Sequence, residues 1–126
     1  LGFTHQLFRG EKSYNGVCIL SKIPLTRIKD EPFGGKGDCR HLAARLPDGT
    51  ELHNLYIPAG GDIPDIKENP KFAHKLQYVA DLEAWSARQN PLEPRIILGD
   101  FNIAPHEHDV WSSKQLRDVV SHTPVE

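Results

Sequence analysis

The segment "CRHLAARLPDGTELHNLYI", residues 39–57, constrains the fold of this chain most, because it predicts a β-hairpin. Its two halves carry apolar residues suited to strands, and they flank "PDGT" at residues 47–50. An Asp-Gly pair between two such segments is a strong signal for a tight turn that joins antiparallel strands. The fold must therefore contain two adjacent antiparallel strands, at residues 39–46 and 51–57.

A helix is expected after this hairpin, over residues 71–89, "KFAHKLQYVADLEAWSARQ". Apolar residues recur there at spacings of three and four, which gives one apolar helical face. They are Phe72, Leu76, Val79, Leu82 and Trp85. Asn90 and Pro91 are expected to end the helix. Residues 57–70 concentrate Pro, Gly, Asp and Asn, so they predict a long loop between the hairpin and the helix.

Two more strands are expected, one on each side of the hairpin and helix. "YNGVCILSK", residues 14–22, is a compact apolar run before Pro24. "RIILG", residues 95–99, is a continuous apolar run of the kind that is buried on both faces of a sheet. "SSKQLRDVV", residues 112–120, predicts a short final helix. Strands that alternate with a helix predict an α/β domain.

Length and composition suit a single soluble domain over residues 1–126. The formal net charge is -2, so a nucleic-acid partner would need a local basic patch rather than a basic surface overall. No run of about 18 apolar residues occurs and the first residues lack the layout of a signal peptide, so we expect no membrane span and a cytoplasmic setting. Cys18 and Cys39 lack the spacing typical of zinc ligands, so free thiols are expected.

The motif "GDFN" at the end of the predicted strand 95–99 places Asp100 and Asn102 two residues apart. In an extended segment both side chains project to one side, beyond the carboxyl end of the strand, where ligands gather in α/β proteins. A carboxylate accepts a proton from water or holds a hard cation, and an amide orients a phosphate without adding charge. An Asx turn, in which both side chains bond nearby backbone amides, is equally compatible with the motif.

Tyr56 closes the second strand of the hairpin, directly before "IPAGG". A phenol at this junction can donate to a phosphate oxygen while its ring stays packed, and a buried Tyr with a satisfied hydroxyl is the alternative. Asn54 lies two residues earlier on the same face, where it either supports Tyr56 or sits within the sheet. Tyr14, at the start of the first predicted strand, is either an aromatic wedge for a base stack or a plain strand-start residue.

Histidines and basic residues form no recognisable metal or phosphate motif. "HEHD", residues 106–109, has its histidines two apart rather than at the i, i+4 spacing of zincins, so we expect a solvated loop. "PFGGKGDCR", residues 32–40, is Gly-rich but lacks the Walker spacing and precedes no predicted helix. Lys71 and Lys75 lie one turn apart on the predicted helix and are expected to point the same way.

Taken together, five segments resemble the exonuclease III family of apurinic/apyrimidinic (AP) endonucleases, within the endonuclease/exonuclease/phosphatase superfamily. In the family's order they are "YNGVCILSK", "GDCRHLAARL", "HNLYIPAGG", "KFAHKLQYVADLEAW" and "LGDFNIAPHEHDVW". "LGDFNIAP" with "LYIPAG" upstream is more specific than either motif alone, and "HDVW" is similar to bacterial members. The resemblance covers nearly the whole chain, as a central portion of the family's sequence.

The resemblance implies a portion of a four-layer α/β sandwich of the deoxyribonuclease I type, with mixed, mostly antiparallel sheets flanked by helices. It also implies a DNA-repair enzyme that hydrolyses DNA phosphodiester bonds with a divalent cation, Mg²⁺ or Mn²⁺. Exonuclease action from 3′ ends, cleavage at abasic sites and removal of 3′-phosphates would share one site. The expected partner is double-stranded DNA with abasic sites or 3′ ends, and the whole protein is expected to be a monomer.

The family's site residues carry over to several positions of this chain. Asp100 falls on the Asp that activates or orients the attacking water, and Asn102 on the Asn that holds the same network. Both are therefore candidate metal-site residues as well as catalytic ones. Tyr56 falls on the Tyr that touches the scissile phosphate, and Tyr14 and Arg40 fall where relatives contact DNA. Lys75 is added to these expected DNA contacts.

Two departures from the family pattern matter. Ala59 follows "YIP", where relatives often carry an amide side chain that reaches phosphate. The family's N-terminal Asn and metal-binding Glu, and its C-terminal Asp and "SDH" segment, are not among these residues. We therefore expect the full-length parent to be an active nuclease, and residues 1–126 alone to be inactive or nearly so.

Two alternatives stay open at the level of sequence. A phosphodiesterase of the same superfamily could act on a non-DNA phosphate substrate, such as an inositol phosphate or sphingomyelin. A truncated nuclease-like module could bind or scaffold without catalysis. The sequence does not distinguish which of the nuclease activities would dominate, because all of them use one site.

Overall fold

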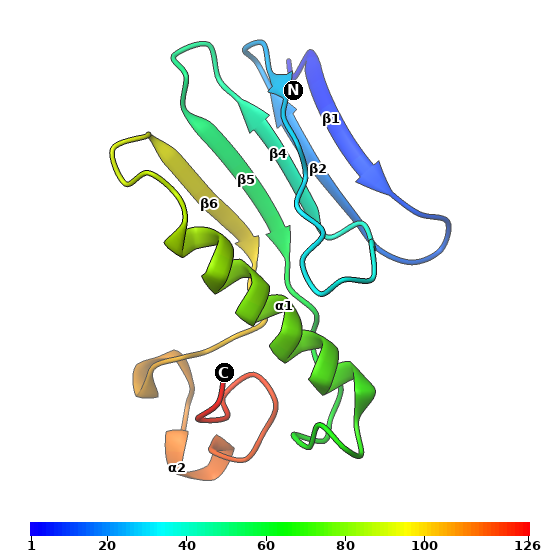
Figure 1. The fold of residues 1–126 in the computed structure, drawn as a ribbon, viewed down its shortest axis with the longest axis vertical. Helices are drawn as coiled ribbons and strands as arrows, with labels where there is room; N and C mark the ends of the chain where they lie inside the picture. The colour runs from blue at the N-terminus through cyan, green and yellow to red at the C-terminus, as the bar shows by residue number, and fades with distance from the viewer.

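The computed structural model describes all 126 residues as two β-sheets and one long helix, followed by short helical turns (Figure 1). The strands are β1 (His5–Gly10), β2 (Gly16–Ser21), β3 (Thr26–Arg27), β4 (His41–Arg45), β5 (Glu51–Tyr56) and β6 (Arg95–Asp100). The helices are α1 (Pro70–Ala87), a 3₁₀ turn at Glu107–Asp109 and α2 (Ser113–Leu116). β1 and β2 form an antiparallel pair, and the second sheet has the order β3-β4-β5-β6.

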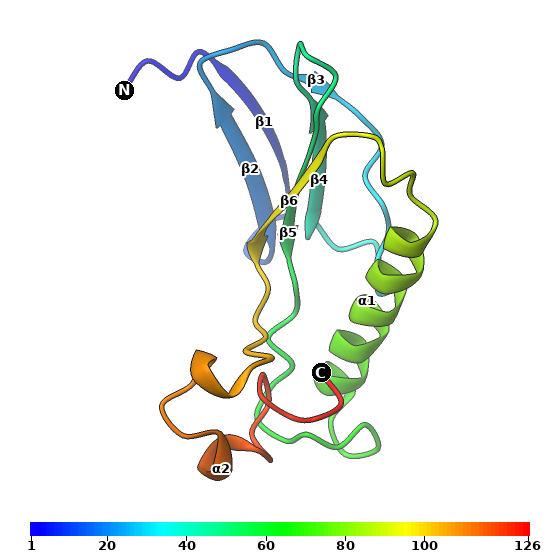
Figure 2. The same cartoon turned by 90° about the vertical axis from the view of Figure 1, so that its left-hand side faces the viewer.

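The two sheets and α1 are stacked in layers, with the four-stranded sheet in the middle (Figure 2). Val17 and Ile19 of β2 pack with Leu42 and Ala44 of β4 in the core between the sheets. A second core, between the other face of the sheet and α1, contains Phe33, Leu55, Ile57, Tyr78 and Trp85. This arrangement is the mixed α/β class that the sequence predicts.

The hairpin and the long helix occur where the sequence predicts them. β4 and β5 are antiparallel and pair Arg45 with Glu51 next to the turn. In α1, Asn69 caps the N-terminus by accepting from the backbone N–H of Lys71, and Pro70 occupies the first turn, where a missing N–H costs nothing. The helix ends at Ala87, two residues before the predicted end.

The other sequence predictions differ more from the structure. β2 confirms the strand predicted at 14–22, and α2 confirms the last helix, although it is only four residues long. β1 and β3 were not predicted. The structure contains no regular element between Tyr56 and Pro70, as the long predicted loop requires. None of the helices combines the length and the apolarity that crossing a bilayer needs.

The strand buried on both faces is β4, and the prediction that β6 is buried in this way is wrong for this chain. In β4, Leu42, Ala43 and Ala44 are completely buried. In β6, Ile96, Ile97 and Leu98 are 46%, 38% and 43% exposed. The reason is position, since β6 is the last strand of the sheet and has a neighbour only on the β5 side.

Candidate active site at the ends of β5 and β6

Tyr56 and Asp100 lie side by side at the C-terminal ends of two adjacent parallel strands. They are paired in the register of β5 and β6, and the backbone N–H of Ile57 donates to the Asp100 carbonyl oxygen at 2.9 Å. Asp100 is exposed, whereas Tyr56 is half-buried and packs against the core between the sheets. The structure thus brings together two candidate residues that are 44 positions apart in the sequence.

Asn102 does not project as the next residue of an extended strand, contrary to the prediction. β6 ends at Asp100, and Asn102 has a left-handed backbone with φ of 50°. Its backbone N–H donates to Asp100 Oδ1 at 3.0 Å, which is the Asx contact considered as the alternative. Its side-chain Nδ2 donates to the Ile57 carbonyl oxygen at 2.9 Å. The turn holds Asn102 against the end of β5, next to Asp100.

Gly99 permits this close approach of the two strands. It has φ of +136°, and a Cβ at this position would overlap the Leu55 carbonyl oxygen of the neighbouring strand. A residue with any side chain would push the end of β6 away from β5. The glycine in "LGDFN" therefore serves the approach of Asp100 to Tyr56, a role that the sequence analysis did not assign.

Arg40 lies against the ring of Tyr56. Its guanidinium carbon is 4.7 Å from the Tyr56 ring centroid and 5.8 Å from that of Tyr14. The two residues also share two hydrogen bonds. The Tyr56 backbone N–H donates to the Arg40 carbonyl at 2.8 Å, and the side-chain Nη1 of Arg40 donates to the Tyr56 carbonyl at 3.3 Å. Tyr14, Arg40 and Tyr56, three predicted site residues, therefore form one cluster, in which Tyr14 is 72% exposed.

Asp38 and His74 hold the side chain of Arg40 in place through hydrogen bonds. The sequence predicted no role for either residue. Asp38 Oδ2 accepts from Arg40 Nε at 2.7 Å and lies 3.3 Å from His74 Nε2. Burial alone would raise the pKa of Asp38, but the hydrogen bonds from Arg40 and His74 outweigh it and lower the pKa. The same ion pair raises the pKa of Arg40 against the opposing effect of burial. The only sign of this ion pair in the sequence is that an acidic residue, Asp38, stands two positions before Arg40.

A cleft of about 350 Å³ opens beside this cluster. Its lining residues are Tyr14, Lys36, Arg40, Pro58, Ala59, Gly60, Gly61, Asp62, Lys71 and His74. The side chains of Lys36, Arg40 and Lys71 and the ring of Tyr14 therefore line one cleft next to Tyr56. Asp62 is the acidic residue of this lining. This is the local basic patch that a chain of net charge -2 would need for a phosphate-bearing partner.

Lys75 is fully buried, and the prediction that it contacts DNA is wrong. Its ammonium group donates to the carbonyl oxygens of Asn102 and Ala59 at 2.6 and 3.2 Å, and it pairs with the carboxylate of Glu126. An interval of four residues exceeds one helical turn by about 40°. That offset leaves Lys71 exposed at the cleft and turns Lys75 toward the sheet and loops.

The remaining predicted features play smaller parts. Asn54 donates to the Cys18 carbonyl at 2.9 Å and so links the two sheets instead of supporting Tyr56. "HEHD" forms the exposed 3₁₀ turn after β6, in agreement with the prediction of a solvated segment. Cys18 and Cys39 are free thiols, as predicted.

The site offers hard oxygen donors of the kind that Mg²⁺ or Mn²⁺ prefers. They are the exposed carboxylate of Asp100 and the amide oxygen of Asn102, whose amide nitrogen is already used on Ile57. The structure contains no group of three or more His, Cys, Asp or Glu side chains that could hold a metal. The donors therefore fit such a cation in type but do not form a complete ligand set.

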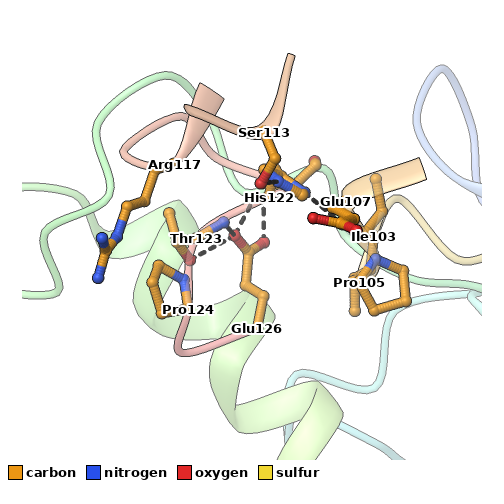
Figure 3. A pocket seen from close by; sticks show the side chains of 11 residues that line it. Ile103, Pro105, Glu107, Ser113, Arg117, His122, Thr123, Pro124 and Glu126 are labelled. Atoms are coloured by element: carbon orange, nitrogen blue, oxygen red, sulfur yellow. Dashed lines mark hydrogen bonds between the residues drawn. The ribbon is translucent and has the colours of Figure 1, made fainter. Parts of the chain in front are cut away.

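A second cavity, of about 380 Å³, lies between the segment after β6 and the C-terminal residues (Figure 3). Its polar groups bond mainly to one another. Ser113 Oγ is 2.8 Å from His122 Nε2, and the Glu126 carboxylate accepts from Thr123 Oγ1 at 2.7 Å and from the Ser121 N–H at 2.9 Å. These contacts hold the residues that follow Asn102 in place.

The chain matches the model of the endonuclease/exonuclease/phosphatase family over residues 1–120. The chain belongs to this family. Its fold also matches the structure of an AP endonuclease from Archaeoglobus fulgidus, with a TM-score of 0.82 and 27% identity over 96% of this chain. The 3′ phosphatase NExo from Neisseria, bound to a product DNA hairpin, matches with a TM-score of 0.77 and 27% identity over 94% of this chain.

A 3′-5′ exonuclease (NExo) structure from Neisseria meningitidis has a TM-score of 0.73 and 28% identity over 93% of this chain. In each case the match covers 45% or 46% of the other chain, so these residues span a little under half the length of the structures they resemble. The chain therefore matches part of the deoxyribonuclease I-like fold of AP endonucleases, and the family resemblance recognised from the sequence is confirmed.

Proposed function

We propose that this chain is the part of a DNA-repair hydrolase that positions the scissile phosphate and the attacking water. The observation that carries the proposal is the pairing of Tyr56 with Asp100 at two strand ends, with the guanidinium of Arg40 on the Tyr56 ring. Family membership and the likeness to an AP endonuclease, to a 3′ phosphatase bound to DNA and to a 3′-5′ exonuclease support DNA as the substrate. Abasic sites and 3′ ends are the substrate features that we propose.

The residues of the site suggest a division of labour. Asp100, an exposed carboxylate, would accept the proton of a water that attacks phosphorus in line with the leaving oxygen. The Tyr56 hydroxyl would donate to a non-bridging phosphate oxygen, and the amide of Asn102 would orient the water or the phosphate. The positive charge of the Arg40 guanidinium, which lies on the Tyr56 ring, would favour the negative charge of the phosphate next to Tyr56.

A divalent cation belongs to the same proposal. Asp100 and Asn102 would contribute a carboxylate and an amide oxygen to Mg²⁺ or Mn²⁺, which when bound would neutralise charge that develops on the phosphate oxygens. We place the other ligands in the part of the family fold that this chain does not span. The complete four-layer sandwich, a monomeric state and a cytoplasmic setting are parts of the same proposal.

The basic cleft would hold the DNA backbone next to the reacting phosphate. Lys36, Arg40 and Lys71 line it together with the exposed ring of Tyr14. Phosphate contacts of this kind fix the register of a nucleic acid without reading its sequence. An aromatic ring at the rim of such a cleft can in addition stack on an unpaired base.

The test is hydrolysis by the full-length gene product with Mg²⁺ or Mn²⁺ on three DNA duplexes, which carry an abasic site, a recessed 3′ end or a 3′-phosphate. We expect cleavage of at least one of them, and a loss of at least about 10²-fold in kcat for Asp100→Asn, the size typical of removing a general base. Residues 1–126 assayed alone are expected to be inactive. An inositol phosphate and a sphingomyelin substrate run in parallel.

Two outcomes would contradict the proposal. One is hydrolysis of the lipid or inositol phosphate without any cleavage of DNA, which would favour the alternative substrate class. The other is unchanged DNA cleavage by Asp100→Asn in a folded protein, which would remove the central residue from the mechanism.

A further inference from the structure

Lys75 ties together the two loops that carry the candidate site. Its ammonium group donates to the Asn102 carbonyl at 2.6 Å, in the turn after β6, and to the Ala59 carbonyl at 3.2 Å, in the loop after β5. It also donates to Ser121 Oγ at 3.1 Å and pairs with the carboxylate of Glu126. Two of its partners are main-chain atoms within three residues of Tyr56 and Asp100.

The alkyl part of Lys75 fixes the same loop by packing. Gly60 has φ of +93°, and a Cβ there would lie 2.8 Å from Lys75 Cδ and 2.9 Å from Val120 Cγ1. The backbone of Gly60 therefore rests directly on the lysine side chain. The loop after β5 is held from one side by this packing and from the other by the hydrogen bond between Asn69 Nδ2 and the Gly60 carbonyl at 2.9 Å.

An ammonium group is costly to bury unless hydrogen bonds and an opposite charge compensate it. Lys75 has no exposed surface, so neither solvent nor DNA can provide that compensation. The carboxylate of Glu126 balances the charge. The hydrogen bond to the Asn102 carbonyl has a different effect. It restrains Asn102, which is the one non-glycine residue of the site that has a left-handed backbone.

We propose that Lys75 is a positioning residue for hydrolysis at this site. By holding the Asn102 carbonyl against the Ala59 loop, it keeps the Asn102 amide and the Asp100 carboxylate in register with Tyr56. The expected effect of Lys75 on kcat rests on the proposed function. The expected effect of Lys75 on the order of the Asn102 turn does not depend on the proposed function.

The experiment compares Lys75→Met with Glu126→Gln in the full-length gene product, with Mg²⁺ and the DNA duplex that the protein cleaves best. Lys75→Met retains an unbranched apolar stem and removes all four polar contacts. Glu126→Gln removes the negative charge that pairs with Lys75 and leaves the contacts of Lys75 with Asn102 and Ala59. Lys67→Met, at an exposed lysine in the loop before α1, controls for loss of a positive charge.

A positioning role predicts a split between the kinetic constants. Lys75→Met is expected to lower kcat by about 10²-fold, as small displacements of catalytic groups do, with KM for DNA changed by less than about threefold. Glu126→Gln is expected to lower the melting temperature while kcat stays within about threefold of the unsubstituted protein. Hydrogen exchange of the Asn102 and Ile57 amides is expected to accelerate in Lys75→Met and to remain slow in Lys67→Met.

A purely structural role predicts something else, namely that kcat follows thermal stability in both variants. Equal kcat losses in Glu126→Gln and Lys75→Met, or an unchanged kcat in folded Lys75→Met, would overturn the inference. If Lys75→Met does not fold, Lys75→Gln replaces it, because its amide keeps N–H donors on a shorter chain. A wild-type kcat in Lys75→Gln together with accelerated exchange of the Asn102 amide would likewise overturn the inference.

The two proposals fail in different ways. If the unsubstituted protein cleaves no DNA, the proposed function is wrong, and the exchange rates of the Asn102 and Ile57 amides still test the positioning. If the unsubstituted protein cleaves DNA and Lys75→Met does so equally well with unchanged exchange, only the inference about Lys75 is wrong.

Discussion

Tyr56 and Asp100 are register partners on the parallel strands β5 and β6, and the backbone bond from Ile57 to the Asp100 carbonyl closes the ladder at this point. A phenol and a carboxylate are thus fixed by main-chain hydrogen bonds rather than by flexible loops. Groups mounted on a sheet in this way keep their separation within the limits that a phosphate reaction needs.

Gly99→Ala is expected to destabilise the protein by at least about 2 kcal/mol, because a methyl group would overlap the Leu55 carbonyl and the backbone φ is positive. The free energy of unfolding, measured with urea, checks this. Gly49→Ala is the matched control, since Gly49 also has a positive φ but no atom lies within 4 Å of its added Cβ. It should cost only about 1 kcal/mol. Equal losses in both variants would show that the close approach at Gly99 has no energetic role.

Arg40→Lys is expected to lower kcat/KM by about tenfold or more. A lysine retains the charge but lacks the planar group that donates from Nε to Asp38 and from Nη1 to the Tyr56 carbonyl while it stacks on the Tyr56 ring. A desolvated cation–π contact contributes about 2 kcal/mol, and 1.4 kcal/mol corresponds to tenfold. Steady-state cleavage of DNA measures the effect. Arg27→Lys, at an exposed ion pair with Asp30, should leave kcat/KM unchanged. An Arg40→Lys protein as active as Arg27→Lys would exclude the stacking role.

Lys71→Met is expected to weaken DNA binding by a salt-dependent amount. Lys71 is exposed and lines the cleft, so it would neutralise one phosphate. The slope of log K against log salt should fall by about 0.9, the value for one phosphate contact on duplex DNA. Fluorescence anisotropy with catalytically silent Ca²⁺ provides the affinities. An unchanged slope would place the DNA backbone elsewhere on the surface.

Stability is expected to fall as the pH drops from about 6.5 toward 4, because of the buried histidines. Burial lowers the pKa of His41 to about 4, and the adjacent His53 adds to the effect. The unfolded chain therefore binds a proton that the folded chain excludes, and the stabilising effect that is present above pH 6.5 is lost through this window. His41 alone accounts for about 2 kcal/mol between pH 7.5 and pH 5.

Urea unfolding at these two pH values provides the measurement. His41→Gln, which keeps a polar side chain beside His53 without the titration, should lose much less stability on acidification. His53 also has a lowered pKa caused by burial, so a residual pH dependence in this variant is expected. A drop of the same size in His41→Gln would assign the effect to other groups.

The sequence by itself determined the local elements and the family. The Asp-Gly turn placed β4 and β5, the three- and four-residue spacing placed α1, and "LGDFNIAP" with "LYIPAG" pointed to the catalytic candidates. These signals are local, since each depends on turn chemistry, helical periodicity or a short motif. β1 and β3 escaped prediction because their segments lack a clear alternation, and sheet pairing rather than propensity forms them.

Only the tertiary structure decided which residues support the candidates and which strands are buried. β6 has the apolar run of a central strand, but it lies at the sheet edge and its apolar side chains are exposed. The burial of a strand depends on its neighbours in the fold and not on its composition. Lys71 and Lys75 are equivalent in sequence pattern, but packing of α1 on the sheet exposes one and buries the other. Asp38 and His74 come into contact beside Arg40 only when the chain folds. Contacts between residues 36 positions apart leave no local pattern in one sequence.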